Sequence, residues 1–361
     1  MARVDAQMIL GVMSGSSLDG MDMALCKFSN RNSYEILEAA TIPYSQTIYK
    51  GLSRIFSMDL KDYFGFVGEF NQYYSQTIKE FLQTLPYPPE LIVSHGHTLY
   101  HNPEGMVSVQ IGNGGVIAST CGINTLCDLR IQDIALGGQG APLASLADAL
   151  LLSEYDVLVN LGGIANVSVR QEGKSLISWD FAPCNQVLNA LANKLGMEFD
   201  KGGHVASKGH MLDGLFKFWA QNAYFRLPPP KSMDNAWLKQ QFIDPISEQY
   251  SIADVMFTFT HFIAHRLVED IKPYLQRRYG KTMLVTGGGA HNTYLMEAIR
   301  EVTGQNGFQL IEAGKILINF KEALLMAYMG YRYLCGEYNI VSSATGGMKN
   351  IVAGALYLAN E

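Results

Sequence analysis

Apolar and polar positions divide the chain into alternating strand-like and helix-like segments. At 21–28 the alternation has period two, with Met21, Met23 and Leu25 on one face and Asp22 on the other, which predicts a strand. Short apolar runs predict further strands at 8–13, 91–93, 106–112, 124–127, 157–160, 176–179 and 283–285.

Helical spacing of apolar residues predicts helices between these strands. The clearest helix ends near Pro273 and carries a stripe of apolar residues, namely Met256, Phe259, Ile263, Leu267 and Ile271. Others are predicted at 59–84, 114–122, 188–195, 294–302 and 321–335. Because strands and helices alternate throughout, the sequence predicts an α/β fold.

Three glycine-rich turns each follow a strand-like run directly. They are SGSSLDG (14–20), LGGIAN (161–166) and TGGGAHN (286–292). Glycine lets a backbone approach a ligand closely, and consecutive amides in such turns bind anions. Asp19 and Asp22 lie in or just after the first turn, where a carboxylate beside a phosphate can hold Mg²⁺. The three turns therefore predict a nucleotide site.

The order of the elements excludes two common nucleotide-binding folds. The chain opens with strand, turn and strand, whereas a Rossmann domain opens with strand, glycine loop and helix. No G-x-G-x-x-G lies in that context, and no G-x-x-x-x-G-K-[ST] occurs. Neither dinucleotide binding nor P-loop chemistry is supported.

Length and composition set broader limits. With 361 residues, 48% of them hydrophobic, the chain is expected to form two domains. A net charge of −6 without a Lys/Arg cluster argues against nucleic-acid binding. The run 8–13 is too short to cross a bilayer, and no signal-peptide pattern opens the sequence. Five scattered cysteines indicate a reducing compartment: Cys26, Cys121, Cys127, Cys184 and Cys335. We expect four of the five to be buried free thiols.

A series of motifs, in order along the chain, resembles the anhydro-N-acetylmuramic acid kinases of the actin/Hsp70/sugar-kinase superfamily. The resemblance runs from residue 9 to the C-terminal GALYLA, and GGQGAPL followed by NLGGIANVS is its most specific part. The other motifs are GVMSGSSLDGMD, SHGHT, VQIGN, DLRIQD, WDFAPCN, PPKS, TGGGAHN and KEALLMA.

This resemblance implies a two-domain, ribonuclease H-like α/β fold with an interdomain cleft. It places one domain at 1–128 with 336–361 and the other at 129–335. It implies a cytoplasmic homodimer that uses ATP, Mg²⁺ and water to convert 1,6-anhydro-N-acetylmuramic acid into N-acetylmuramic acid 6-phosphate during peptidoglycan recycling. Opening of the anhydro bridge by water is coupled to phosphorylation of the oxygen released.

The glycine turns supply the nucleotide-binding residues that the resemblance implies. The metal anchor is Asp19, whereas Asp22 lies on the following strand and has a structural alternative. SGSSLDG taken alone is equally well explained as an ordinary hairpin turn. The full set of predicted cofactor-binding residues is Gly15, Ser16, Ser17, Leu18, Asp19, Gly20, Met21, Asp22, Gly162, Gly163, Gly287, Gly288, Gly289 and Asn292.

The resemblance also assigns the catalytic and sugar-binding residues. Asp180 falls on the family's catalytic aspartate, the general base for water; alone it would be read as a cap or turn residue. Glu322 falls on a substrate-site glutamate; alone it would favour a helix N-terminus. Loops after strands offer further polar groups to hydroxyls and to the lactyl carboxylate, for which a bidentate arginine is suited: His95, Arg130, Asp133 and Gln139.

His95, His97 and His101 also invite a metal-site interpretation. Their H-x-H-x₃-H spacing is loose and no acidic or cysteine partner is near in sequence. Hydrogen-bonding roles are therefore favoured over metal binding.

Three positions depart from the family pattern. Asp180 is followed by Phe-Ala-Pro-Cys-Asn rather than Thr/Cys-Gly-Pro-Gly-Asn, and 231–236 reads KSMDNA rather than KSTGRE. Gly114 replaces a proline. Two alternatives follow, a related kinase with a shifted substrate and a non-catalytic nucleotide switch. The second is disfavoured, because a switch has no need for Asp19, Asp180 and Glu322 together.

Overall fold

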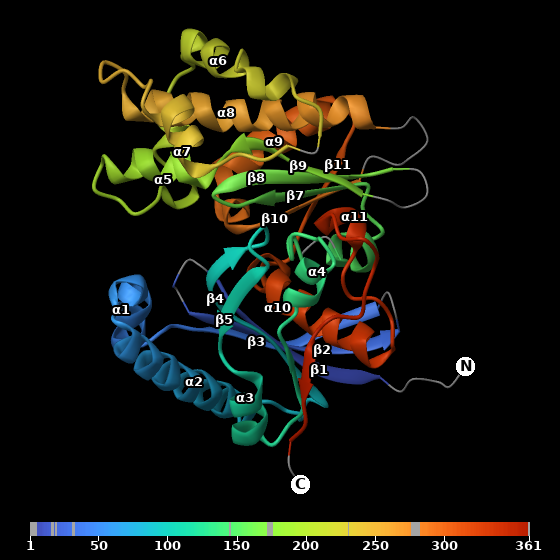
Figure 1. Ribbon diagram of the computed structural model, residues 1–361. Coiled ribbons are helices and arrows are strands. Elements are labelled where there is room, and N and C mark those ends of the chain that lie inside the picture. Colours follow the sequence, from blue (N-terminus) through green and yellow to red (C-terminus); the bar gives the residue numbers. More distant parts are fainter. Residues whose placement is uncertain are drawn as a thin grey trace. The chain divides into compact units, whose positions relative to one another are not determined.

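The chain forms two compact units, which the computed structural model in Figure 1 shows. The structure describes residues 6–15, 18, 20–30, 33–143, 146–171, 176–229, 231–275 and 282–359, with the main chain alone at 235 and 236. Unit 1 comprises Met1–Leu152 and Phe320–Glu361, and unit 2 comprises Ser153–Asn319.

These bounds differ from the expected ones, which put 129–152 and 320–335 in the second domain. Both segments belong to unit 1, because each is held by its contacts there. Asp133 accepts a hydrogen bond from Thr345, and a Cβ atom added at Gly11 would lie 2.7 Å from the Ala327 nitrogen.

The sheet of unit 1 begins with an antiparallel hairpin and continues with parallel strands. Strand β1 is antiparallel to β2, β2 is antiparallel to β3, and β1, β4 and β6 run parallel. The order is β12-β6-β4-β1-β2-β3, and β5 pairs with β4. The strands are β1 (Gln7–Ser14), β2 (Met21–Asn30), β3 (Ser33–Ile42), β4 (Leu91–Asn102), β5 (Val107–Ile111), β6 (Thr125–Cys127) and β12 (Ala355–Tyr357).

The sheet of unit 2 repeats this topology. Its order is β11-β10-β7-β8-β9, with β7, β8 and β9 successively antiparallel and β7, β10 and β11 parallel. The repeated arrangement of three antiparallel strands and two parallel ones is the predicted ribonuclease H-like fold, and the α/β class with two sheets is confirmed. The strands are β7 (Val157–Leu161), β8 (Ile164–Arg170), β9 (Leu176–Pro183), β10 (Thr282–Thr286) and β11 (Gln309–Glu312).

Helices cover both faces of the sheet in unit 1. Alternation along β1 puts Leu10 and Val12 in a core with Phe70 and Tyr74 of α2, whereas Gly11 faces the opposite side, against α10. Helix α10 has non-helical backbone angles at Phe320, where unit 1 resumes. The helices of unit 1 are α1 (Gln46–Arg54), α2 (Leu60–Leu82), α3 (Gly114–Cys121), α4 (Ile131–Ala135), most of α10 (Lys315–Leu334) and α11 (Ser342–Thr345).

Unit 2 is built around α8, which is buried over most of its circumference. Phe259 and Phe262 of α8 pack with Trp219 at the end of α6, and Figure 1 shows these two helices side by side. Such a cluster of large rings buries much apolar area and fixes the helices against each other. The helices are α5 (Asn185–Asn193), α6 (Asp213–Ala220), α7 (Asn235–Leu238), α8 (Ile252–Ile271) and α9 (Thr293–Gln305), with helical turns at Ala223–Arg226 and Lys239–Ile243.

The predicted strands are present, and four further strands are additional: β3, β8, β11 and β12. Strand β3 is an edge strand with many polar positions, and β11 has only four residues, so neither gives a strong apolar pattern. All five cysteines are free thiols; Cys26 and Cys184 are buried and the other three are half-buried, so fewer are buried than expected. Within the described part of the chain, no helix has the length and apolar character that a membrane span requires.

Candidate active site

The turn between β1 and β2 is the first predicted phosphate cradle. Ser16, Ser17 and Asp19 lie outside the described residues. Gly20 has φ +154°, and a Cβ atom there would lie 2.8 Å from the Ile42 carbonyl carbon, so glycine is required. Gly15 and Leu18 also lie in the turn, and Leu18 has a positive φ of 59°. Of the described turn residues, Gly15 and Gly20 have no side chain and Leu18 packs against the core of unit 1.

Met21 and Asp22, the first two residues of β2, directly follow the turn. The Met21 side chain is fully buried in the core, so only its main chain can face a ligand. Asp22 is half-buried and its Oδ1 accepts a hydrogen bond from Thr41 Oγ1 at 2.5 Å. Among the described residues no group of three His, Cys, Asp or Glu side chains can hold a metal. Mg²⁺ bound to nucleotide phosphates needs only one or two carboxylates, which Asp22 fits.

A buried polar group anchors the start of this turn. Ser14, the last residue of β1, bonds through Oγ to the Tyr44 hydroxyl and, at 2.8 Å, to His97 Nδ1. Burial lowers the pKa of His97, which favours the neutral ring. We did not predict Ser14 and Tyr44, because a single serine and a distant tyrosine carry no pattern in the sequence.

Unit 1 brings His95 and Arg130 together, 35 residues apart in sequence. Arg130 Nε donates to His95 Nε2 at 2.9 Å, and His95 Nδ1 donates to the Gly96 carbonyl at 2.9 Å. Burial and the adjacent Arg130 guanidinium lower the pKa of His95 to about 3. A neutral His95 therefore orients Arg130.

Glu322 and Gln139 lie near the same guanidinium. Burial lowers the pKa of Arg130, and the Glu322 carboxylate opposes this shift. Arg130 also donates to the Gly140 carbonyl, next to the exposed Gln139. The predicted sugar-binding residues His95, Arg130, Gln139 and Glu322 are thus collected in unit 1.

Asp133, also expected to bind sugar, has a different role. Its side chain is completely buried; Oδ2 accepts from the Gly140 amide at 2.8 Å and Oδ1 from Thr345 Oγ1 at 2.7 Å. These bonds fix the loop that presents Gln139. The signal in the sequence is the neighbouring GGQG, a loop that needs an internal acceptor.

The other two histidines of the H-x-H-x₃-H pattern, His97 and His101, also make hydrogen bonds. His101 Nδ1 lies 3.0 Å from Ser108 Oγ, and His97 bonds to Ser14 as described. These contacts agree with the hydrogen-bonding roles favoured from the sequence.

In unit 2 the second and third glycine turns meet. Thr286 pairs with Asn160 in the sheet, so both turns leave the same edge. Gly287 has φ +87°, and a Cβ atom there would lie 2.6 Å from Asn160 Oδ1. Gly288 and Gly289 continue this turn, and Asn292 caps α9 by accepting from the Leu295 amide at 3.1 Å. Parallel pairing of β7 with β10 explains why turns over 100 residues apart converge.

The turn after Asp180 closes onto the second glycine turn. The Gly163 carbonyl accepts from the Cys184 and Gln186 amides at 3.0 and 3.1 Å, and the Gly162 carbonyl accepts from the Asn185 amide at 3.1 Å. Cys184 replaces a family glycine, and its side chain is accommodated in the buried core of unit 2. Its thiol is fully buried and burial raises its pKa to about 12, so it is unreactive.

Asp180 lies near the end of β9 and is held at three atoms. Its amide donates to the Lys231 carbonyl at 3.0 Å, its carbonyl accepts from the Tyr224 hydroxyl at 2.9 Å, and Oδ2 accepts from the Met233 amide at 2.9 Å. Burial raises the pKa of this half-buried carboxyl group, and the Met233 bond opposes the shift. The second oxygen, Oδ1, has no protein partner among the described hydrogen bonds.

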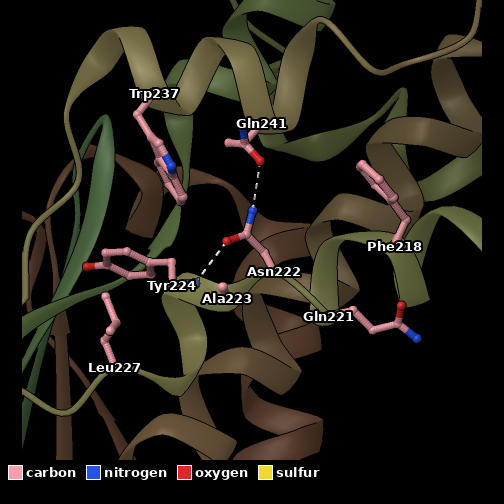
Figure 2. A pocket seen from close by; sticks show the side chains of 8 residues that line it. All are labelled: Phe218, Gln221, Asn222, Ala223, Tyr224, Leu227, Trp237 and Gln241. Carbon is pink, nitrogen blue, oxygen red and sulfur yellow. Dashed lines mark hydrogen bonds between the residues drawn. The ribbon is translucent and has the colours of Figure 1, made fainter.

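A pocket of about 520 Å³ lies in unit 2 (Figure 2). Tyr224 connects it with Asp180, because Tyr224 lines the pocket and its hydroxyl donates to the Asp180 backbone carbonyl. None of the described lining residues is charged, so the pocket offers no cation for a phosphate or carboxylate. The lining consists of Phe218, Gln221, Asn222, Ala223, Tyr224, Leu227, Trp237 and Gln241.

Comparison with known proteins identifies relatives over the full length. A family model described as anhydro-N-acetylmuramic acid kinase matches residues 7–359. A protein of that name from Acaryochloris marina is 30% identical over 97% of this chain and 99% of its own length. Another from Synechocystis is 30% identical over 97% and 98%. A solved structure, component A of the (R)-2-hydroxyglutaryl-CoA dehydratase of Acidaminococcus fermentans, is 13% identical over 91% and 99%, with a TM-score of 0.45 that is too low to support an assignment.

Proposed function

Because the chain belongs to the family of anhydro-N-acetylmuramic acid kinases, we propose that it uses ATP and water to convert 1,6-anhydro-N-acetylmuramic acid into N-acetylmuramic acid 6-phosphate and ADP. The match over residues 7–359 carries this proposal. The enzyme is then an ATP-dependent sugar kinase that also opens an anhydro bridge, a reaction of peptidoglycan recycling.

Asp180 is the proposed general base. Its carboxylate takes a proton from the water that attacks the anomeric carbon; the bond from that carbon to the bridging oxygen breaks, and the released oxygen accepts the γ-phosphoryl group. The bond from Met233 leaves Oδ1 for the water and holds the carboxylate in one orientation. A pKa above the ordinary range makes it a stronger base once ionised.

The glycine turns are the proposed nucleotide site. Backbone amides at Gly15 and Gly20, with those at Gly162 and Gly163, are suited to neutralise phosphoryl oxygens. Gly287, Gly288, Gly289 and Asn292 are assigned to the adenosine. Asp19 and Asp22 are the proposed Mg²⁺ anchors. The ion, when bound, supplies charge neutralisation at the phosphates.

The Arg130 cluster is the proposed site for the sugar. A guanidinium fixed by His95 matches the lactyl carboxylate, and Gln139 and Glu322 offer groups to hydroxyls and the N-acetyl amide. This arrangement explains why a neutral histidine is needed: a protonated one would repel Arg130.

One assay tests the proposed function. Purified protein with Mg-ATP and the anhydro sugar is expected to release ADP and form a reducing, 6-phosphorylated amino sugar, seen by mass spectrometry. N-acetylmuramic acid and N-acetylglucosamine serve as controls, because they lack the anhydro bridge. ATP binding without turnover of the anhydro sugar would exclude the proposed reaction, and turnover of a control alone would favour a shifted substrate.

The homodimer and the cytoplasmic location are proposals from family membership. Light scattering coupled to gel filtration is expected to give about twice the monomer mass of 39.9 kDa. A mass equal to the monomer at micromolar concentration would overturn the dimer.

A further inference from the structure

A buried ionic network lies behind Asp180 and takes no part in the proposed chemistry. Asp270, in the last turn of α8, is 3% exposed, and its Oδ2 lies 3.0 Å from Lys231 Nζ, which is 5% exposed. Asp270 Oδ2 also accepts from Trp179 Nε1 at 2.9 Å. Arg266 contacts Asp270 Oδ1 and lies over the Phe225 ring at 4.6 Å.

The two groups that Asp270 holds through Oδ2 flank Asp180. Trp179 directly precedes Asp180 on β9. Lys231 belongs to the neighbouring segment, and its carbonyl accepts from the Asp180 amide. Two residues later, Met233 donates to Asp180 Oδ2.

The position of β9 explains why such a clamp matters. This strand is at the edge of its sheet, paired with β8 on one side only. On the other side at Asp180, the segment 231–233 takes the place of a strand, although it has no regular secondary structure. That segment belongs to no named strand, so its bond to the Asp180 amide and its side-chain anchors together position the Met233 amide.

We propose that Asp270 is a positioning residue, which holds Trp179 and Lys231 together and thereby fixes the Asp180 carboxylate for its reaction with water. This inference rests on the proposed function of Asp180. Among the described residues, removing the Asp270 charge takes away the ion pair of Lys231, and Arg266 keeps its pair with Glu269, whose side chain is 61% exposed. Mutual repulsion of the cations then displaces the segment 231–233.

The first measurement is the activity of Asp270→Asn. Its kcat is expected to fall about 10- to 100-fold with KM for ATP within about twofold, as for other groups that orient a reacting side chain. Glu269→Gln is the matched control, because it removes the neighbouring carboxylate without touching Trp179 or Lys231; we expect near-normal kcat. Equal losses in the two variants would overturn the proposal.

A double-mutant cycle separates positioning from general loss of structure. In an Asp180→Asn background, Asp270→Asn is expected to lower kcat no further, since the group it positions is absent. Multiplicative losses would show that Asp270 acts elsewhere. Because Asp270→Asn leaves buried cations, Asp270→Asn/Lys231→Met is the second variant; it is expected to regain thermal stability while kcat stays low. Recovery of kcat together with stability would contradict the proposal.

A third readout does not depend on turnover. Hydrogen exchange at the Met233 amide, measured by NMR, is expected to be at least tenfold faster in Asp270→Asn than in wild type and unchanged in Glu269→Gln. Unchanged exchange in Asp270→Asn overturns the clamp. Faster exchange in a protein that does not turn over the anhydro sugar supports the clamp while the proposed function fails, so the two failures are distinguishable.

Discussion

The two units share one strand topology but place different side chains at the ends of equivalent strands. In each, an antiparallel hairpin with a glycine turn opens the sheet and parallel strands follow. In unit 1 the third strand, β3, ends at Ile42, whose backbone leaves no room for a side chain at Gly20. In unit 2 the equivalent strand, β9, carries Asp180. The fold therefore repeats the glycine turn that we propose to bind phosphate, while the side chains at the ends of equivalent strands differ between the units.

The two units also differ in the charge that each presents. Unit 1 gathers a guanidinium held by a neutral histidine, which suits an anionic part of a sugar. Unit 2 presents a carboxylate of raised pKa, which suits proton transfer. Each of the following experiments tests one side of this contrast.

The largest effect is expected from Asp180→Asn in unit 2. The amide keeps the size and the bond from Met233 but cannot take a proton, so kcat should fall by about 10²–10⁴. ATP binding, measured by calorimetry, should be unchanged. Asp234→Asn is the control, since this carboxylate caps the Trp237 amide nearby. Near-normal turnover in Asp180→Asn would place the base elsewhere.

Arg130→Lys in unit 1 is expected to affect binding more than chemistry. Lysine keeps the charge but loses the planar fork and the bond to His95, so KM for the sugar should rise about 10- to 100-fold. The exposed Arg54→Lys serves as the matched control. A change in kcat alone, with KM constant, would contradict the assignment of Arg130 to ground-state sugar binding.

The pH dependence of kcat should report on Asp180 in unit 2 and not on His95 in unit 1. A general base must be ionised, so activity falls as pH drops through the pKa of Asp180; because burial raises that pKa, the acid limb of kcat should lie above the ordinary value of 3.8. His95, with a pKa lowered to about 3, stays neutral across this range. His95→Asn should therefore keep the limb of wild type, and loss of the limb would assign it to His95.

The smallest effect is expected from Gly20→Ala, on stability. A methyl group would approach the backbone at Ile42 and Pro43, and the positive φ disfavours alanine, which together cost about 1–3 kcal/mol of unfolding free energy. Gly68→Ala on α2, where a Cβ atom meets nothing within 4 Å, should be neutral or stabilising. Thermal unfolding measures both; equal effects would show that the turn imposes no special constraint.

Sequence patterns determined the α/β class, the glycine turns and most of the core elements. Alternation along β1 and the apolar stripe of α8 suffice for this, because burial dictates which positions must be apolar. The order of the motifs indicated the family, and the family pattern in turn indicated Asp180, Arg130 and Glu322 as candidate site residues. These features are local in the chain, or fixed by residue type.

Only the tertiary structure decided how these residues are held. Three sets of hydrogen bonds hold them: those that Asp133 accepts, the one from Met233 to Asp180, and the one from Trp179 to Asp270. The partners in these bonds are between 7 and 212 positions apart in the sequence. Hydrogen bonds of this kind depend on which segments the sheet and α8 bring side by side, and neither residue of a pair carries a periodic signal. The unit bounds at 152 and 320 were likewise set by packing, since Ala323 and Ala327 belong with β1 whatever their place in the chain.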